Sequence, residues 1–134
     1  AIRHARGLTL VELLITLAVA MTLLMVGVPV FRSSVANNQV TTATNDLVAH
    51  VTLARSEAIK RVTPVTICAS TDGVTCSGVN GWETGWIVFT DRDTLGLIDG
   101  DDELLRVVGA RSGPLTITAD AAAMRYMPDG SLDI

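Results

Sequence analysis

The feature that most constrains this chain is an apolar run from Leu8 to Val30, in which Glu12 is the only ionisable residue. As a helix these 23 residues would extend about 34 Å, enough to cross a bilayer core of about 30 Å. A secretory signal peptide is the rival interpretation, but its apolar region would be about 7–15 residues and would end at a small-residue cleavage site. No Ala-x-Ala stands directly after Val30. The sequence therefore favours a retained membrane span.

The charges flanking this run predict its orientation. Arg3 and Arg6 precede it, and only Arg32 follows it closely. Because basic residues tend to stay on the cytoplasmic side, the N-terminus is expected in the cytoplasm and the distal part on the exported side.

The two cysteines, Cys68 and Cys76, both lie in the distal part and enclose a short loop. In an exported domain this arrangement indicates a disulfide, and two free buried thiols are the alternative. Since the chain has no further cysteine and no histidine nearby, a zinc site would lack ligands.

Beyond the apolar run, apolar residues recur at every third or fourth position, as in an amphipathic helix. This stripe consists of Val40, Ala43, Leu47, Val51, Ala54 and Ala58. Gly27 and Pro29 are the only helix breakers between about Leu8 and Arg61. A proline costs one backbone hydrogen bond and kinks or locally opens a helix. We expect one long helix, with its first half in lipid and its second half in water.

After this helix the pattern changes to short β-branched or aromatic runs separated by Gly, Asp, Asn and Ser clusters, which is typical of an antiparallel meander. The expected strands are residues 64–70, 84–90, 103–108, 114–118 and 123–127. Alternation in the first and fourth runs predicts one buried face, which the helical stripe would cover. The predicted fold class is α+β: a long N-terminal helix packed on a small antiparallel sheet.

The N-terminal residues R-G-L-T-L-V-E-L-L-I-T-L-A-V (6–19) closely resemble the type III signal of type IV pilins and type II secretion pseudopilins. In that signal a prepilin peptidase cuts after a glycine, the new apolar N-terminus is methylated, and a glutamate stands fifth. The resemblance implies cleavage after Gly7, methylation of Leu8, where Phe is usual, and an assembly role for Glu12. Pro29 falls where many pilins carry a helix-opening proline.

The same resemblance implies three segments: a leader (1–7), a transmembrane assembly helix (8–31) and a periplasmic domain (32–134). The protein would be a single-pass protein of the bacterial inner membrane that later enters a pilus or pseudopilus. Its expected partners are other pilin subunits, the prepilin peptidase and the inner membrane.

Four distal segments narrow the match: LARSEAIKR (53–61), VTIC (65–68), WETGWIVFTD (82–91) and MRYMPDGSL (124–132). They resemble the GspH/FimT family of minor pilins and pseudopilins. This resemblance implies a structural subunit that initiates or tips a type IV pilus or a type II secretion pseudopilus. The alternative is a pilus-associated DNA receptor for natural transformation.

Charge bears on the DNA alternative. The chain carries a formal charge of −4, and without residues 1–7 eight basic residues face 14 acidic ones. A net acidic domain is a poor generic nucleic-acid binder. The basic cluster of Arg55, Lys60 and Arg61 suits the C-terminus of a helix, and DNA contact is its second interpretation. Family members implicated in DNA uptake resemble each other in a basic C-terminal Gly-Arg-x-Arg tail, whereas the last basic residue here is Arg125.

Glu12 is the most informative single residue, because a bare carboxylate in lipid costs a few kcal/mol and is functional by default. The simpler interpretation is that it lies near the membrane edge and reaches the headgroups. The functional interpretation, implied by the resemblance, pairs it with the amine at Leu8 of a neighbouring subunit, which would set a docking register.

The acidic segment 91–103 partly matches an EF-hand loop, with Asp91, Asp93, Asp99 and Asp102 at candidate ligand positions. The flanking residues are expected to be strands rather than helices, so the alternatives are a solvated acidic turn and a weak Ca²⁺ site. No other cofactor is expected. Trp82 and Trp86 are interpreted as core residues rather than a stacking platform for bases.

No enzymatic activity is expected. His4 and His50 lack the Ser, Cys or metal-ligand neighbours that catalysis would require. Ser56 and Glu57 do not complete a triad with His50, because adjacent residues on a helix do not face each other.

Overall fold

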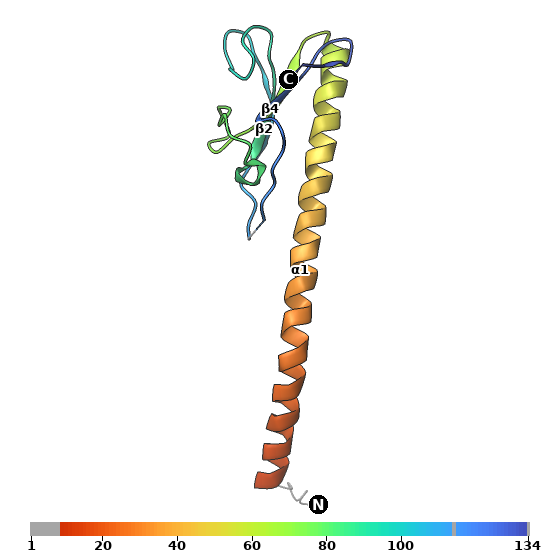
Figure 1. The fold of residues 1–134 in the computed structure, drawn as a ribbon, viewed down its shortest axis with the longest axis vertical. Helices are drawn as coiled ribbons and strands as arrows, with labels where there is room; N and C mark the ends of the chain where they lie inside the picture. Colours follow the sequence, from red (N-terminus) through yellow and green to blue (C-terminus); the bar gives the residue numbers. More distant parts are fainter. Residues whose placement is uncertain (1–8, 114, 134) are drawn as a thin grey trace, which may run out of the picture. The chain divides into compact units, whose positions relative to one another are not determined.

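The computed structural model describes residues 9–113 and 115–133 (Figure 1). There the chain forms one long α-helix and a five-stranded antiparallel sheet, which confirms the predicted α+β fold. The chain divides into two compact units, Ala1–Asn38 and Gln39–Ile134. The expected processing residues, Gly7 and Leu8, lie outside the described residues.

The helix α1 (Leu10–Arg61) has a capped N-terminus. Thr9 Oγ1 accepts a hydrogen bond from the backbone N–H of Glu12 (3.2 Å), and the Thr9 carbonyl accepts one from Leu13 (3.1 Å). Threonine followed three residues later by glutamate is the capping-box pattern, and a carboxylate in the first turn also suits the helix dipole. Thr9 and Glu12 together therefore define where the helix starts.

Pro29 lies inside α1, and the helix continues through it. Because proline has no N–H, one intrahelical hydrogen bond is lost at this position. The hydroxyl groups of Ser33 and Ser34 both donate to the carbonyl of Val30 (2.8 and 3.1 Å). The predicted single helix is confirmed, with no break at the proline.

The C-terminus of α1 is closed by a residue in the left-handed region. Val62 has φ 53°, and its N–H donates to the Ile59 carbonyl (3.4 Å), while the N–H of Thr63 donates to the Ala58 carbonyl (3.2 Å). Glycine usually occupies such a position, because a β-branched side chain is strained there. Lys60 and Arg61 in the last turn complement the helix dipole.

The sheet consists of β1 (Val65–Ala69), β2 (Trp86–Thr90), β3 (Leu104–Val108), β4 (Ala123–Tyr126) and β5 (Leu132–Asp133), and a 3₁₀ turn η1 (Trp82–Thr84) precedes β2. The strand order is β3-β2-β1-β4-β5, and all neighbours pair antiparallel. β3 and β5 are therefore the two edges. The register of β2 and β3 shifts between Val88 and Phe89, which places a bulge near the start of β3.

The helical stripe covers one face of the sheet. Ala43, Ala54 and Ala58 are buried, and Leu47 and Val51 pack partly buried against the core. The sheet residues of this core are Val65, Ile67, Ala69, Trp86 and Val88, with Trp82 of η1 beside them. Val40, the first residue of the predicted stripe, is instead half exposed.

The opposite face of the sheet is also covered at its centre, because every residue of β1 and β2 is buried. There Cys68, Ile87 and Phe89 pack with Cys76, Ile98 and Ala123. The expectation of one buried face, which applies to the run that contains β1, is therefore wrong for this strand, and β2 is covered on both faces as well. The segments that follow β1 and β2 fold back over them, and alternation within a strand cannot reveal such cover.

The run 114–118 is not a strand, and Pro114 lies outside the described residues. Thr118 forms one isolated bridge with Gly81, and the neighbouring backbone bonds instead to η1. The N–H of Ile117 donates to Glu83 Oε2 (3.1 Å), and its carbonyl accepts from the N–H of Trp82 (2.9 Å). The Glu83 carboxylate thus accepts the hydrogen bond that the backbone of a neighbouring strand would accept in a sheet. The fifth strand is β5, which the sequence analysis does not predict.

Candidate assembly surfaces

The N-terminal part of α1 has the length and composition of a membrane span. Its most apolar 18-residue window has a mean hydropathy of 2.5, and none of that window is buried. A signal sequence near an N-terminus shows the same properties. These features fit a single-pass, membrane-anchored protein.

Glu12 is exposed in the first turn of this apolar helix. Its backbone N–H is held by the Thr9 cap, so the carboxylate projects from a defined turn. Among the described residues no cation lies within ion-pair distance of it. The only charged residue of the apolar run is therefore positioned at the helix start, with its charge uncompensated by this part of the chain.

The predicted disulfide is confirmed. Cys68 and Cys76 are bonded, with their Cα atoms 5.6 Å apart. Inside the loop, the Asp72 carboxylate accepts hydrogen bonds from the N–H groups of Thr75 and Val74 (both 2.8 Å) and from the Thr75 hydroxyl (2.7 Å). These bonds, with Thr75 contributing most, hold the pKa of Asp72 well below its usual value. Asp72 therefore shapes the loop that the disulfide closes.

The acidic loop, residues 91–103 between β2 and β3, is organised from inside by Asp91. This residue is fully buried, and its Oδ2 accepts from the Thr66 hydroxyl (2.6 Å) and from the N–H of Gly96 (2.9 Å). Asp102 accepts more weakly from the Thr90 hydroxyl (3.4 Å) and from the N–H of Arg92 (3.3 Å). Both carboxylates act as acceptors that shape the loop.

The four predicted calcium ligands differ in their placement. Asp91 is internal and Asp102 half-buried, while Asp93 and Asp99 are exposed. Across the described part of the chain, no group of three or more His, Cys, Asp or Glu side chains is placed to hold a metal ion. Weak Ca²⁺ binding at this loop stays a prediction. It would be supported if millimolar Ca²⁺ raised the melting temperature.

The basic cluster at the end of α1 is largely occupied by carboxylates. Arg61 forms ion pairs with Glu57 and, through Nη1, with Oε2 of Glu103 (2.7 Å), the residue just before β3. The Lys60 ammonium lies 3.5 Å from the Glu57 carboxylate. The Arg61 hydrogen bond and the charge of Lys60 lower the pKa of Glu57. Arg55 remains exposed on the helix surface.

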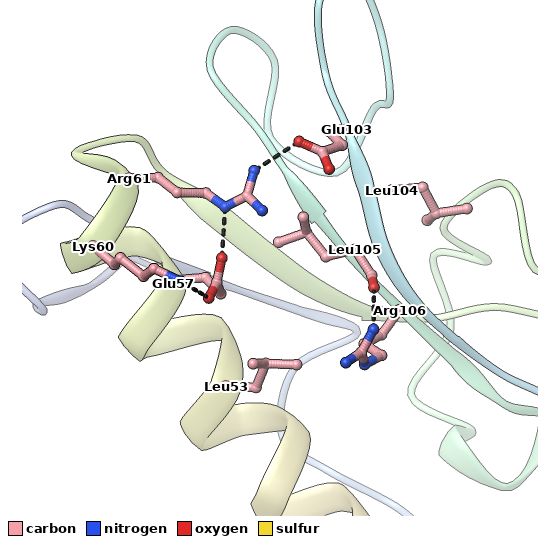
Figure 2. Close-up of a pocket in the computed structure, with 8 residues that line it drawn as sticks. All are labelled: Leu53, Glu57, Lys60, Arg61, Glu103, Leu104, Leu105 and Arg106. Carbon is pink, nitrogen blue, oxygen red and sulfur yellow. Dashed lines mark hydrogen bonds and ion pairs between the residues drawn. The ribbon is translucent and has the colours of Figure 1, made fainter.

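A groove of about 260 Å³ lies beside these ion pairs (Figure 2). We call it the β3 groove; it is lined by Leu53, Glu57, Lys60 and Arg61 of α1 and by Glu103, Leu104, Leu105 and Arg106. Small-molecule pockets usually measure about 300–1,000 Å³, so this space better suits one or two side chains of a protein partner.

The two tryptophans belong to the core, as predicted. Trp82 and Trp86 are fully buried, and their indole N–H groups donate to the Ala121 carbonyl (3.1 Å) and to His50 Nδ1 (3.3 Å). The Arg111 guanidinium lies over the Trp86 ring at 4.9 Å. Buried rings cannot stack on bases.

Sequence reasoning missed some residues that organise these surfaces. Arg111 ion-pairs with Asp46 of α1 (2.9 Å), which ties the segment after β3 to the helix. Glu103 and Arg106 line the β3 groove. Contacts between residues so far apart leave no local pattern. Thr9 differs, because the T-x-x-E pattern at 9–12 is visible in the sequence.

An apolar N-terminal helix that continues into a domain with a small, disulfide-bonded antiparallel sheet defines a pilin-like subunit. The family model described as type II transport protein GspH matches residues 43–133, more than half of the chain. The chain therefore belongs to the GspH family of pilin-like proteins. This family is structural rather than enzymatic and supports a role as pseudopilin or minor pilin, in assembly with other pilin subunits. Searches of curated proteins and of solved structures gave no significant match.

Proposed function

We propose that this chain is processed after Gly7 and enters a type II secretion pseudopilus or a type IV pilus, with an initiation or tip role. The observation that carries the proposal is the combination of the family match with a lone carboxylate, Glu12, in the first turn of an apolar helix. The prepilin peptidase would release Leu8 as the methylated N-terminus. The span would lie in the inner membrane, with the sheet domain in the periplasm.

In this proposal Glu12 compensates the amine at Leu8 of an adjacent subunit. A carboxylate in lipid costs a few kcal/mol, and pairing with a cation offsets that cost only when the subunits dock in one register. Small residues such as Ala18, Ala20 and Gly27 permit close approach of neighbouring helices. Nothing within 4 Å would obstruct a Cβ at Gly27, so its surface is open.

The test replaces Glu12 with Gln, which keeps the capping-box residue type and removes only the charge. Membrane insertion should be unchanged or improved, while incorporation into sheared filaments or co-purified pilin complexes should fall at least about tenfold. Asp120→Asn, the same loss of charge at an exposed residue of the sheet domain, is the control. Normal incorporation of Glu12→Gln would overturn the docking role.

Processing is tested separately by intact-mass measurement of membrane-extracted protein. The mature chain should begin at Leu8, and a bulky residue at position 7 should block maturation. A chain that retains residues 1–7 beside an active peptidase would contradict the proposal.

The DNA-receptor alternative gains no support from these surfaces. Two of its three residues, Lys60 and Arg61, lie beside Glu57, and Arg61 also binds Glu103. Phosphate binding would have to compete with these carboxylates.

A further inference from the structure

We propose that the β3 groove binds the acidic loop of a second copy of this chain. The inference does not depend on processing or on Glu12; it concerns two surfaces of the unit Gln39–Ile134. One is a groove lined by leucines and by charged residues with one surplus positive charge, and the other is a loop with exposed leucines between carboxylates.

The positive surplus of the groove follows from its ion pairs (Figure 2). Three cations line it against two carboxylates: Arg61 pairs with both Glu57 and Glu103, and Lys60, whose side chain is 77% exposed, lies 3.5 Å from Glu57. Arg106 is the third cation; among the described residues it pairs with no carboxylate, and its Nη1 donates to the carbonyl of Leu105 (3.1 Å). The surplus of one positive charge therefore rests on Arg106, and on a chain that is acidic overall it favours a negatively charged partner at this residue.

Leucine side chains form the apolar part of the groove lining. Leu53 of α1 and Leu105 of β3 both line it, and each is only half-buried. A partner that fills the groove must therefore supply apolar side chains close to carboxylates.

The acidic loop has this chemistry. Leu95 and Leu97 are 43% and 57% exposed, and the carboxylates of Asp93 and Asp99 are exposed on either side of them. Single exposed leucines are ordinary on protein surfaces. Here two of them flank Gly96, whose N–H is held by the buried Asp91. The loop is thus already ordered for binding, which reduces the entropy cost of association.

The occupant must come from another molecule. Ile98 of the loop packs against the cluster that contains Cys68 and Cys76, and Gly96 is so near that an added Cβ would lie 3.8 Å from Cys76 Sγ. The loop therefore lies on the disulfide side of the sheet. The groove is formed with α1, which covers the other side. The acidic loop ends at Glu103, which also lines the groove, so the two surfaces are neighbours on one molecule. Two copies related by a two-fold axis could therefore each place the loop in the groove of the other, which closes a dimer.

The experiment measures the molar mass of the full-length, detergent-solubilised chain across a concentration series, without other pilin subunits. We expect a dimer. Arg106→Glu and Asp99→Arg should each weaken self-association about tenfold or more, and mixing the two variants should restore pairing through the reversed charges. Asp120→Arg, an equal charge change at an exposed residue outside both surfaces, should behave as wild type.

A photo-crosslinking residue at Leu97 locates the contact. Its products should map to 53–61 or 103–106 of the second copy. The proposal is overturned if the wild type stays monomeric, if Asp120→Arg weakens association as much as Arg106→Glu, or if the crosslinks map elsewhere or to a different protein. Apolar helix association in the detergent cannot mimic the charge-swap rescue. If this dimer is not found, the proposed role of Glu12 in filament incorporation is not contradicted. Normal incorporation of Glu12→Gln would likewise not contradict the dimer.

Discussion

Arg125 of β4 reaches Asp91 beyond the end of β2. Its Nη2 donates to the Asp91 carbonyl (2.6 Å) and lies 3.7 Å from Asp91 Oδ1, which accepts no hydrogen bond from the described residues. Asp91 is fully buried, and the Arg125 side chain is 13% exposed. Together with the bonds from Thr66 and Gly96, this contact links β1, β4 and the acidic loop.

Asp91→Ala should destabilise the fold by about 3–4 kcal/mol, because removing one member of a buried pair leaves the other charge uncompensated. Asp91→Asn should cost less, since its amide oxygen can still accept from Thr66 and Gly96. Denaturant unfolding of the full chain measures both, with Asp120→Ala as a control expected to change little. A loss below about 1 kcal/mol for Asp91→Ala would show that the pair is not a structural anchor.

Loss of the Cys68–Cys76 bond should reduce stability by about 2–3 kcal/mol, the chain-entropy value for so short a loop. The double variant, with Cys68→Ala and Cys76→Ala in one chain, tests this loss in unfolding experiments. Alkylation of the wild type without reductant should label neither thiol, and labelling of both would contradict the bonded structure.

Asp72 predicts a specific pH dependence. Its folded pKa is lowered by hydrogen bonds from Thr75 and Val74, so its contribution is present above the unfolded pKa of about 3.9 and is lost as the pH falls towards the folded pKa. Asp72→Ala should therefore melt below the wild type at pH 7, and the difference should shrink as the pH falls below about 4. Asp120→Ala provides the matched acidic control. A difference that is independent of pH would refute this role for the carboxylate.

Val62→Gly should stabilise the chain by about 0.5–1 kcal/mol. The valine is strained at φ 53° and the residue is 75% exposed, so glycine relieves the strain while little burial is lost. Val74→Gly replaces another exposed valine, one that does not have a positive φ, and should be neutral or destabilising. Thermal unfolding compares the two, and a lower melting temperature for Val62→Gly would be evidence against strain at the helix end.

Much of this protein could be read from local patterns in the chain. The apolar run and the stripe from Ala43 to Ala58 predict one helix with two environments, because a period near 3.6 leaves only one side of a helix to bury. The disulfide follows from two cysteines in a domain expected to be exported. The glutamate in the first turn is also visible, since position along the chain defines it.

Only the tertiary structure decided the pairings between distant segments. Asp91 appears in the sequence as a candidate metal ligand, but the fold buries it against Thr66 and Arg125 and makes it an internal anchor. Likewise Arg61 appears in the sequence as a member of the basic cluster at the end of the helix. The fold pairs it with Glu103 at the edge of the β3 groove. A carboxylate has the same local pattern whether it faces solvent, a metal or an arginine. What surrounds it depends on which strands pair, and long-range packing sets that.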